Sequence, residues 1–502
     1  MPPAPRLSLA RTTLASLVAD AVLALSSVAA IPFMVGRLGV EQYGIFGLIT
    51  VLAGQLVGLH LGIGWAATRR LAETRARGGP GAREATLRAV LLLSLGASLL
   101  VAAGFAVLAT LSWTRAFRGS AEVLHAALAT VPAGVVIAAM QPALHGIHGI
   151  LYGEERFLLV VGLRLVHGVG RLGAAVAAVA LGGGVVATLW SQAALDLLVV
   201  LAAVAVIGVR TGARPAASLA GEARVLLMMG VPFAVAGVFA ALLADVEKLA
   251  IGMARSVEDF TYYSVPFNVT LRLGVFAVAL ASVLAARLSS LKAADDMAGA
   301  AALARRARRI SLAAMALVVA PVVAVVPELL RLWVGADFAA RSTLLSRILL
   351  VALLPRTLAY ITESVLRATA RPVTFTVLYA LELPLHLVAV YLLVRGWGVQ
   401  GAAVAWLLRV AVDVAAQWVM AGRALGASLG RAVETLGPPV ALGLLAVACQ
   451  ALDAVTSPWL RLAAGFALAV VLVLRLLSQE DWSILRRMLW PETPAEARSP
   501  SR

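Results

Sequence analysis

The sequence predicts an all-α polytopic membrane protein with about fourteen transmembrane helices. Of its 502 residues, 61% are hydrophobic and only 14% are charged, and the mean hydropathy is +0.94. A soluble domain averages roughly half apolar and about a quarter charged residues. Apolar runs of about 20 residues, each long enough to cross a bilayer as a helix, recur along the whole chain. Length, composition and spacing therefore all indicate repeated membrane spans.

The expected helices follow these apolar runs in order. The first run is too long for the core of a signal peptide, so we expect it to be a retained helix. If the last two runs are not spans, the count falls to twelve. The predicted helices lie near 12–35, 44–66, 86–111, 123–149, 157–181, 185–208, 227–252, 262–287, 309–333, 343–366, 373–394, 401–422, 436–453 and 460–477.

The connections between the expected helices alternate between strongly basic segments and segments with few basic residues. The segment 69–83 carries five arginines, and the segment 292–309 carries a lysine and four arginines. Short basic loops stay on the cytoplasmic side of a membrane. We therefore expect both termini in the cytoplasm. The same loop bias explains the net charge of +16 without nucleic acid as a partner.

The sequence lacks the motifs of common enzymes. It has no GxSxG, no GxxxxGK[ST] and no paired cysteines, so we predict no enzyme activity and no cofactor. Cys449 is the only cysteine, which excludes an intramolecular disulfide. His145 and His148 have no third ligand at a suitable spacing, so no metal site is expected.

Several short patterns occur twice, about 217 positions apart. VEQYGIF at 40–46 matches VEDFTYY at 257–263, and LYGEERF at 151–157 falls opposite LRATARP at 366–372. Trp190 falls opposite Trp406, and Asp196 falls opposite Asp413. The repeats predict two parallel six-helix halves with a cavity between them, and rocking of one half against the other. The predicted divisions are a six-helix bundle at 1–209, a cytoplasmic linker at 210–226, a second bundle at 227–424, an extra helix pair at 425–480 and a cytoplasmic tail at 481–502.

The same junctions carry a family resemblance. IPFMVGRLGVEQYGIFGLI at 31–49, DVEKLAIGMARSVEDFTYYSV at 245–265, PELLRLWVGADFAARSTLLSRIL at 327–349 and GWGVQGAAVAW at 396–406 resemble segments of the polysaccharide-biosynthesis flippases. The resemblance covers about 25–425. That family belongs to a superfamily that also holds multidrug and toxin extrusion (MATE) transporters and peptidoglycan-precursor flippases. The resemblance implies a MATE-like fold and transport of a lipid-linked oligosaccharide.

Basic residues lie deep inside several expected helices. An ionisable side chain near the bilayer centre costs roughly 2.5–3.5 kcal/mol on insertion scales, so each one needs a reason. Arg164, His167 and Arg171 are spaced to share one face of the fifth helix. Three further candidates for a cationic cavity are Arg272, Arg356 and Arg409.

Such arginines suit a phosphate, because a guanidinium binds phosphate bidentately and stays charged at every relevant pH. Other roles stay open: Arg409 and Asp413 form an i, i+4 pair, and Arg347 near a helix end has room to snorkel.

Acidic residues also lie deep, and they supply the candidates for ion coupling. Asp20, in the first helix, is the leading candidate, although Ser16 four residues earlier suggests a structural role. Asp196 and Asp413, which are repeat-related, either couple to protons or sodium or brace helix packing. Glu363, Glu382 and the group Asp245, Glu247 and Lys248 complete the acidic set.

These features predict a flippase that moves a polyprenyl-phosphate- or pyrophosphate-linked saccharide across the bacterial cell membrane by alternating access. Its partners would be the lipid-linked substrate, membrane lipid and a polysaccharide polymerase or glycosyltransferase. One alternative is an ion-coupled drug or cation antiporter, which would favour an acidic cavity. The other is a membrane-embedded glycan polymerase or transferase, which the short outer loops disfavour.

Overall fold

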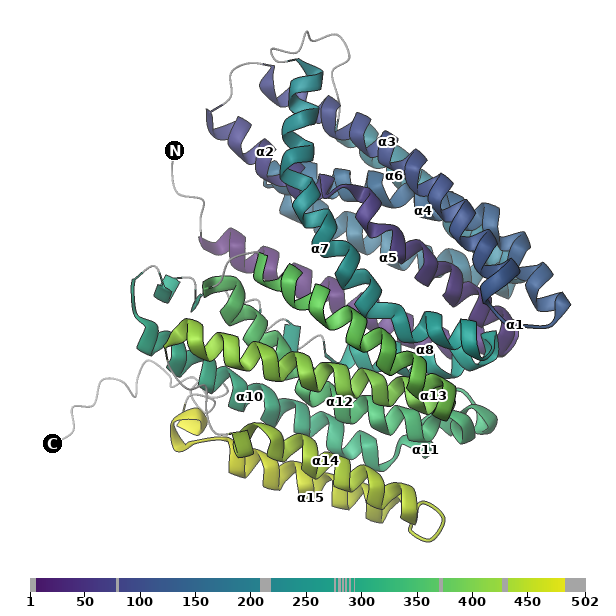
Figure 1. The fold of residues 1–502 in the computed structure, drawn as a ribbon, viewed down its shortest axis with the longest axis vertical. Coiled ribbons are helices and arrows are strands. Elements are labelled where there is room, and N and C mark those ends of the chain that lie inside the picture. Colours follow the sequence, from purple (N-terminus) through teal and green to yellow (C-terminus); the bar gives the residue numbers. More distant parts are fainter. Residues whose placement is uncertain are drawn as a thin grey trace. The chain divides into compact units, whose positions relative to one another are not determined.

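A computed structural model shows that the described part of the chain is almost entirely helical, with no strand in it (Figure 1). The structure describes residues 6–77, 81–207, 218–274, 277–278, 281, 284, 287–288, 290–292, 294–369, 373–426 and 432–483. Parts of the predicted linker (210–217), of the segment before the last helix pair (427–431) and of the tail (484–502) lie outside these residues.

Ten helices in the described ranges are long and apolar enough to cross a membrane, which confirms the predicted class. Two of them each contain a pair of helices joined end to end. Helix α1 (Arg6–Gln55) breaks at Gly39, and α13 (Val373–Leu425) breaks at Gly398. Both glycines have positive φ, 79° and 62°, which side chains with a Cβ rarely adopt. The breaks fall between the predicted ranges 12–35 and 44–66, and between 373–394 and 401–422.

The chain forms two compact units. Unit 1 contains residues 1–265 and 375–405, and unit 2 contains residues 266–374 and 406–502. Helix α7 (Leu219–Ala254) and the first half of α13 thus belong to unit 1. The predicted division into two six-helix halves stays a prediction.

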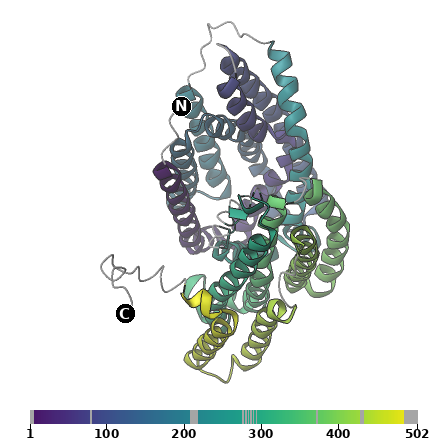
Figure 2. The ribbon, with the colours of Figure 1, turned by 90° about the vertical axis from the view of Figure 1, so that its left-hand side faces the viewer.

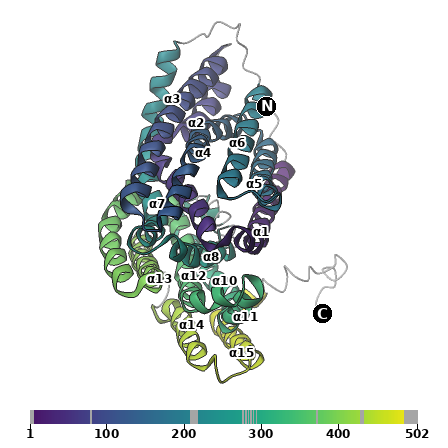
Figure 3. The same ribbon diagram turned by 90° about the vertical axis from the view of Figure 1, so that its right-hand side faces the viewer.

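Unit 1 is built on α1 and the next five long helices. They are α2 (Ile63–Arg77), α3 (Ala82–Leu111), α4 (Ala121–Gly153), α5 (Phe157–Ala180) and α6 (Val185–Ile207). Helix α4 packs against α3, α2 and α6, and α5 packs against α6 and α1 (Figure 3). A core of buried aliphatic side chains joins α2, α3, α4 and α6. This packing fixes the face of α5 that carries the predicted basic residues.

The predicted second helix, 44–66, is interrupted in the structure. A short 3₁₀ helix (η1, Leu56–His60) ends at Leu61 and Gly62, which have φ of 54° and 61°, and α2 begins at Ile63. A Cβ at Gly62 would collide with the backbone of Gly230 in α7. The crossing backbone of α7 therefore requires glycine here, which explains a break that contains no proline.

Unit 2 contains the end of α8 (Val257–Leu273), α10 (Met297–Ala324), α11 (Val326–Trp333), α12 (Ala336–Thr369) and the second half of α13. The chain then forms α14 (Ala432–Leu452) and α15 (Pro458–Leu476), the predicted extra helix pair. Both pack on α10, and the pair is coloured yellow-green to yellow in Figure 2.

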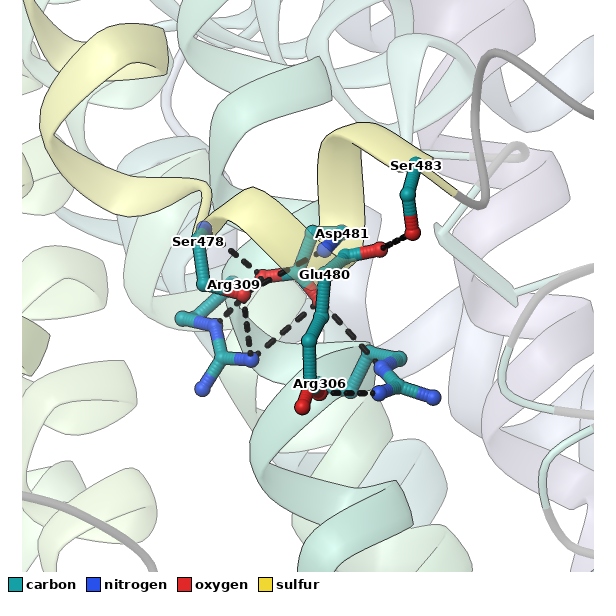
Figure 4. A network of polar contacts seen from close by, with 6 residues as sticks. All are labelled: Arg306, Arg309, Ser478, Glu480, Asp481 and Ser483. Atoms are coloured by element: carbon teal, nitrogen blue, oxygen red, sulfur yellow. Dashed lines mark hydrogen bonds and ion pairs between the residues drawn. The ribbon is translucent and has the colours of Figure 1, made fainter.

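Ionic contacts attach the last helix pair to unit 2 at both of its ends. Arg347 of α12 is 1% exposed, and its guanidinium makes two bonds to the Asp453 carboxylate, at 2.6 and 2.8 Å. The position of Arg347 near a helix end would allow snorkelling, but its side chain is held in these buried contacts instead. After α15, the buried Asp481 accepts from Arg309 (2.8 Å) and Arg306 (3.2 Å) of α10 (Figure 4).

Candidate substrate-binding site

The three predicted basic residues of α5 all meet carboxylates within unit 1. Arg164 Nη2 lies 2.5 Å from Asp20 Oδ1 of α1, and His167 Nε2 lies 2.8 Å from Asp196 Oδ1 of α6. Arg171 Nη1 lies 3.8 Å from the other oxygen of Asp196. All three side chains therefore reach acidic groups of α1 and α6, the two helices that pack on α5.

Exposure differs sharply along this face. The Arg164 and Asp20 side chains are 35% and 36% exposed, whereas Asp196 is 0% exposed and His167 and Arg171 are 17% and 20% exposed. The sequence predicted a cationic cavity, but the two arginines of this cluster face two carboxylates. An anion that binds here would therefore have to compete with Asp20 for Arg164, the more accessible of the two guanidinium groups.

Histidines gather near this cluster. His148 of α4 interacts electrostatically with Arg164, His167 and His145. The rings of His145 and His60 lie 4.7 Å apart. In the described ranges, no group of three or more His, Cys, Asp or Glu side chains is arranged to hold a metal ion. His148 therefore lies near Arg164, a position that the sequence did not indicate.

A second polar cluster lies in unit 2, around Arg356 of α12. Its Nη1 lies 3.2 Å from Glu363 Oε1 and 3.9 Å from Asp413 Oδ2, and its guanidinium carbon lies 4.4 Å from the Tyr360 ring centroid. Arg367 approaches the other oxygen of Glu363 at 3.6 Å. The side chain of Arg356 is 22% exposed, so it is partly covered by these partners.

Asp413 connects this cluster to α13. It is 3% exposed, and Gln417 Nε2 donates to its Oδ1 at 2.7 Å, while Thr362 Oγ1 donates to Gln417 Oε1 at 2.8 Å. Arg409, one helical turn earlier, also acts electrostatically on Asp413. The cluster thus contains Arg356, Arg367 and Arg409 against two carboxylates and carries a net positive charge, unlike the cluster in unit 1.

The repeat-related aspartates occupy comparable environments. Asp196 and Asp413 are both buried and both lie within 4 Å of an arginine of a neighbouring helix. The repeat-related tryptophans do not match in this way, because Trp190 is 46% exposed and Trp406 is buried against Phe267.

Two other predictions have a clear structural outcome. Asp20 pairs with Arg164, 144 positions away, and the suggested pairing with Ser16 has no counterpart among the contacts of the described residues. Arg272 is exposed on α8, and no hydrogen bond or ion pair between described residues joins it to either cluster.

Sequence reasoning missed a buried pair in unit 1. His386 Nε2 of α13 lies 2.9 Å from Glu247 Oε1 of α7, and these side chains are 2% and 1% exposed. Glu382 is buried one turn before His386, and Asp245 bonds to Lys248 (2.8 Å) near Glu247. The sequence signal for this buried acidic region was His386, which follows Glu382 by four residues in an apolar helix.

A family model described as "polysaccharide biosynthesis protein" matches residues 10–292, which is more than half of the chain. A candidate O-antigen transporter of Shigella flexneri is 24% identical over 199 residues, which is 39% of this chain and 46% of that protein. The match thus spans less than half the length of this relative.

Solved structures show the fold. An inward-facing MATE family multidrug resistance transporter matches with a TM-score of 0.67 at 15% identity, covering 82% of this chain and 98% of that one. The lipid II flippase MurJ, in an inward closed conformation, matches with a TM-score of 0.65 at 11% identity, covering 96% and 99%. A Pyrococcus furiosus transporter of the MOP superfamily matches with a TM-score of 0.60 at 15% identity, covering 83% and 95%. The protein has the MATE-like fold, and its chain belongs to the polysaccharide biosynthesis protein family.

Proposed function

We propose that the protein is a flippase that moves a polyprenyl-phosphate- or pyrophosphate-linked saccharide across the bacterial cell membrane by alternating access. Membership of the polysaccharide biosynthesis family supports this proposal, as do relatives named as a candidate O-antigen transporter and a lipid II flippase. The observation that carries it is the pair of arginine–carboxylate clusters inside membrane-spanning helices, one in each unit.

The chemistry of the clusters suits a phosphate head group that passes through the protein. A phosphate cannot cross hydrocarbon unaided, because its charges would lose their hydration. Guanidinium groups replace that hydration with charge-assisted hydrogen bonds. Arg164 and Arg171 in unit 1, and Arg356 and Arg409 in unit 2, supply these donors, and His167 supplies a further one when protonated.

The carboxylates keep the empty protein stable and make binding reversible. An unpaired buried arginine would be strongly destabilising. In our proposal, substrate phosphate displaces Asp20 from Arg164, and the released carboxylate couples this step to an ion, either a proton or sodium. Asp20 is thereby the candidate ion-coupling group, while Asp196 and Asp413 hold their helices and arginines in place.

Loss of surface polysaccharide tests the function. In the bacterium that encodes the protein, deletion of the gene should abolish one surface polysaccharide, and the wild-type gene should restore it. Arg164→Gln should fail to restore it although the protein reaches the membrane. Arg69→Gln is the matched control, because Arg69 is 72% exposed and its ion pair among the described residues is with Glu73 of its own helix. Normal polysaccharide in the deletion strain would contradict the proposal.

The buried acidic region around Glu247 and Glu382 favours a second candidate, an ion-coupled cation antiporter. Acidic residues in a membrane cavity suit a cationic substrate. This candidate predicts that deletion raises sensitivity to cationic dyes and leaves the surface polysaccharide intact. The deletion strain therefore distinguishes the two functions directly.

A further inference from the structure

Three apolar spans of unit 1 end at one corner of the molecule. Helix α3 begins at Ala82, α4 ends at Gly153 and α5 begins at Phe157. Because these helices are long and apolar enough to span a membrane, we expect the residues just beyond their ends to lie at the level of the phospholipid head groups. Arg75 and Arg83, from the two described ends of the basic segment, belong to the same corner, which the charge pattern predicts to face the cytoplasm.

A polar pocket of about 430 Å³ opens at this corner. This volume falls within the range of small-ligand sites, roughly 300–1,000 Å³. Helix α2 contributes Leu71, Thr74 and Arg75, α3 contributes Arg83, and the α4–α5 turn contributes Glu154 and Arg156.

Three guanidinium groups line the pocket against one carboxylate. Arg83 Nε donates to Glu154 Oε1 at 2.7 Å, and Arg156 Nε lies 3.4 Å from Glu154 Oε2. Arg75 Nη1 pairs with Glu155, outside the lining, at 3.1 Å. The three arginine side chains are 46–48% exposed. Because a guanidinium has five N–H donors, each retains donors for an anion in the pocket.

Close helix packing holds these side chains in place. A Cβ at Gly153 would lie 2.7 Å from the Leu71 Cβ and 2.9 Å from the Thr68 carbonyl oxygen, so α4 approaches α2 as closely as glycine allows. The Arg156 amide donates to the Leu151 carbonyl at 2.9 Å, and Glu155 adopts a φ of 58°, which completes the tight turn. The pocket is therefore formed before any ligand binds.

An apolar groove of about 370 Å³ is lined by Leu151, in the last turn of α4, and by residues from the first turns of α5. Leu158, Leu159, Leu163 and Val166 of α5 line it together with Ala202 and Val206 of α6. Leu158 and Val206 are 65% and 57% exposed, so the groove is open on the surface of unit 1. Gly162 lies in its floor, and a Cβ there would meet no atom within 4 Å.

We infer that this corner binds an anionic phospholipid, with its phosphate on Arg75, Arg83 and Arg156 and an acyl chain in the groove along α5. The choice of an anionic lipid rests on charge complementarity with the three arginines. Arginines bind phosphate oxygens bidentately, and basic pockets beside transmembrane helices attract acidic head groups. The site is separate from the Arg164 cluster and does not depend on the proposed transport function.

The test uses the full-length protein in nanodiscs. After delipidation, the wild type is reconstituted in phosphatidylcholine with increasing fractions of phosphatidylglycerol, and the midpoint of thermal unfolding and the retained phosphatidylglycerol are measured. A ligand that binds only the folded state raises the midpoint. The double variant Arg83→Gln/Arg156→Gln should bind phosphatidylglycerol at least about tenfold more weakly, since it loses charge-assisted bonds.

A second variant probes the groove without touching the charges. Gly162→Leu places a side chain in the groove and should also lower phosphatidylglycerol retention. Gly173→Leu is its control, because a Cβ at Gly173 of the same helix also meets nothing within 4 Å. Arg69→Gln is the control for charge, since it lies in the same basic segment and does not line the pocket.

Four results would overturn the inference. The first is a midpoint that does not depend on phosphatidylglycerol. The second is equal loss of retention in the control variants. The third is an equal rise produced by inorganic phosphate in pure phosphatidylcholine, which would make the pocket a site for soluble anions. The fourth is a rise with undecaprenyl phosphate and not with phosphatidylglycerol, which would make the corner an entry site for substrate.

Discussion

The Thr261 hydroxyl donates a 2.8 Å hydrogen bond to the carbonyl of Val40, which joins the two copies of the repeated junction motif. The copies also pack closely, because a Cβ at Gly44 would collide with the Val257 carbonyl oxygen. Gly47, directly after the first copy, faces the ring of the buried Phe260. The motif in the first copy has a further role, since Gln42 Oε1 accepts from the Val185 amide at the start of α6. The two copies of the motif therefore pack directly against each other inside unit 1.

A larger side chain at the contact between Gly47 and Phe260 should destabilise the protein. A Cβ at Gly47 would lie 2.5 Å from Phe260 Cε1, so Gly47→Leu should lower the free energy of unfolding by about 1–3 kcal/mol. Phe260→Ala in the same chain should recover part of the loss. Thermal unfolding in detergent measures both. Gly36→Leu in the same helix is the control, because a Cβ at Gly36 meets nothing within 4 Å, and an equal loss there would refute the packing argument.

Removing Arg347 should be more damaging than removing any exposed arginine. Its side chain is 1% exposed and bonds to Asp453, Gln450 and the Val323 carbonyl. Arg347→Met removes the Arg347 bonds to Gln450 and the Val323 carbonyl and leaves Asp453 paired, among the described residues, with Arg461 alone. Breaking a buried pair costs about 3–5 kcal/mol. Arg341→Met, at a side chain 52% exposed in the same helix, should cost less than about 1 kcal/mol. Similar unfolding midpoints for both variants would contradict this assignment.

Asp481 should make attachment of the C-terminal segment depend on acid pH. Burial opposes its charge, but hydrogen bonds from Arg309 and Ser478 outweigh burial and lower the pKa of Asp481 from 3.8 to about 2. The folded pKa lies below the ordinary value, so the charged form stabilises the fold above about pH 4 and that stability is lost as pH falls toward 2. The difference in unfolding midpoint between wild type and Asp481→Asn should be large at neutral pH and shrink below pH 4. A difference that stays constant with pH would show that the Asp481 charge does not matter.

The helical breaks and spans were largely predictable, whereas the long-range polar contacts were not. Gly39 and Gly398 separate apolar runs that are each long enough to span, so composition alone indicates two helices at each place. The break at Gly62 depends on the backbone of Gly230, which a local pattern cannot reveal. Each helix pattern predicts its own face but not the helix that will cover it.

The same limit applies to the site. The spacing of Arg164, His167 and Arg171 predicted their common face, since helical periodicity is local. Their partners Asp20 and Asp196 lie on other helices, and the first is 144 positions from Arg164, so pairing required tertiary packing. For the same reason the sequence contained both Glu247 and His386 without indicating that they meet.

The most direct test is transbilayer movement of a fluorescent polyprenyl-pyrophosphate-linked saccharide in proteoliposomes, with a charge-swapped pair as the key variant. Asp20→Arg/Arg164→Asp keeps an ion pair between α1 and α5 but moves the cation to another helix. The account predicts rapid movement with wild type and with Arg69→Gln, and movement at the protein-free rate with Arg164→Gln and with the swapped pair. Full activity in the swapped pair would show that the ion pair only stabilises the fold, and no movement with wild type would contradict the flippase itself.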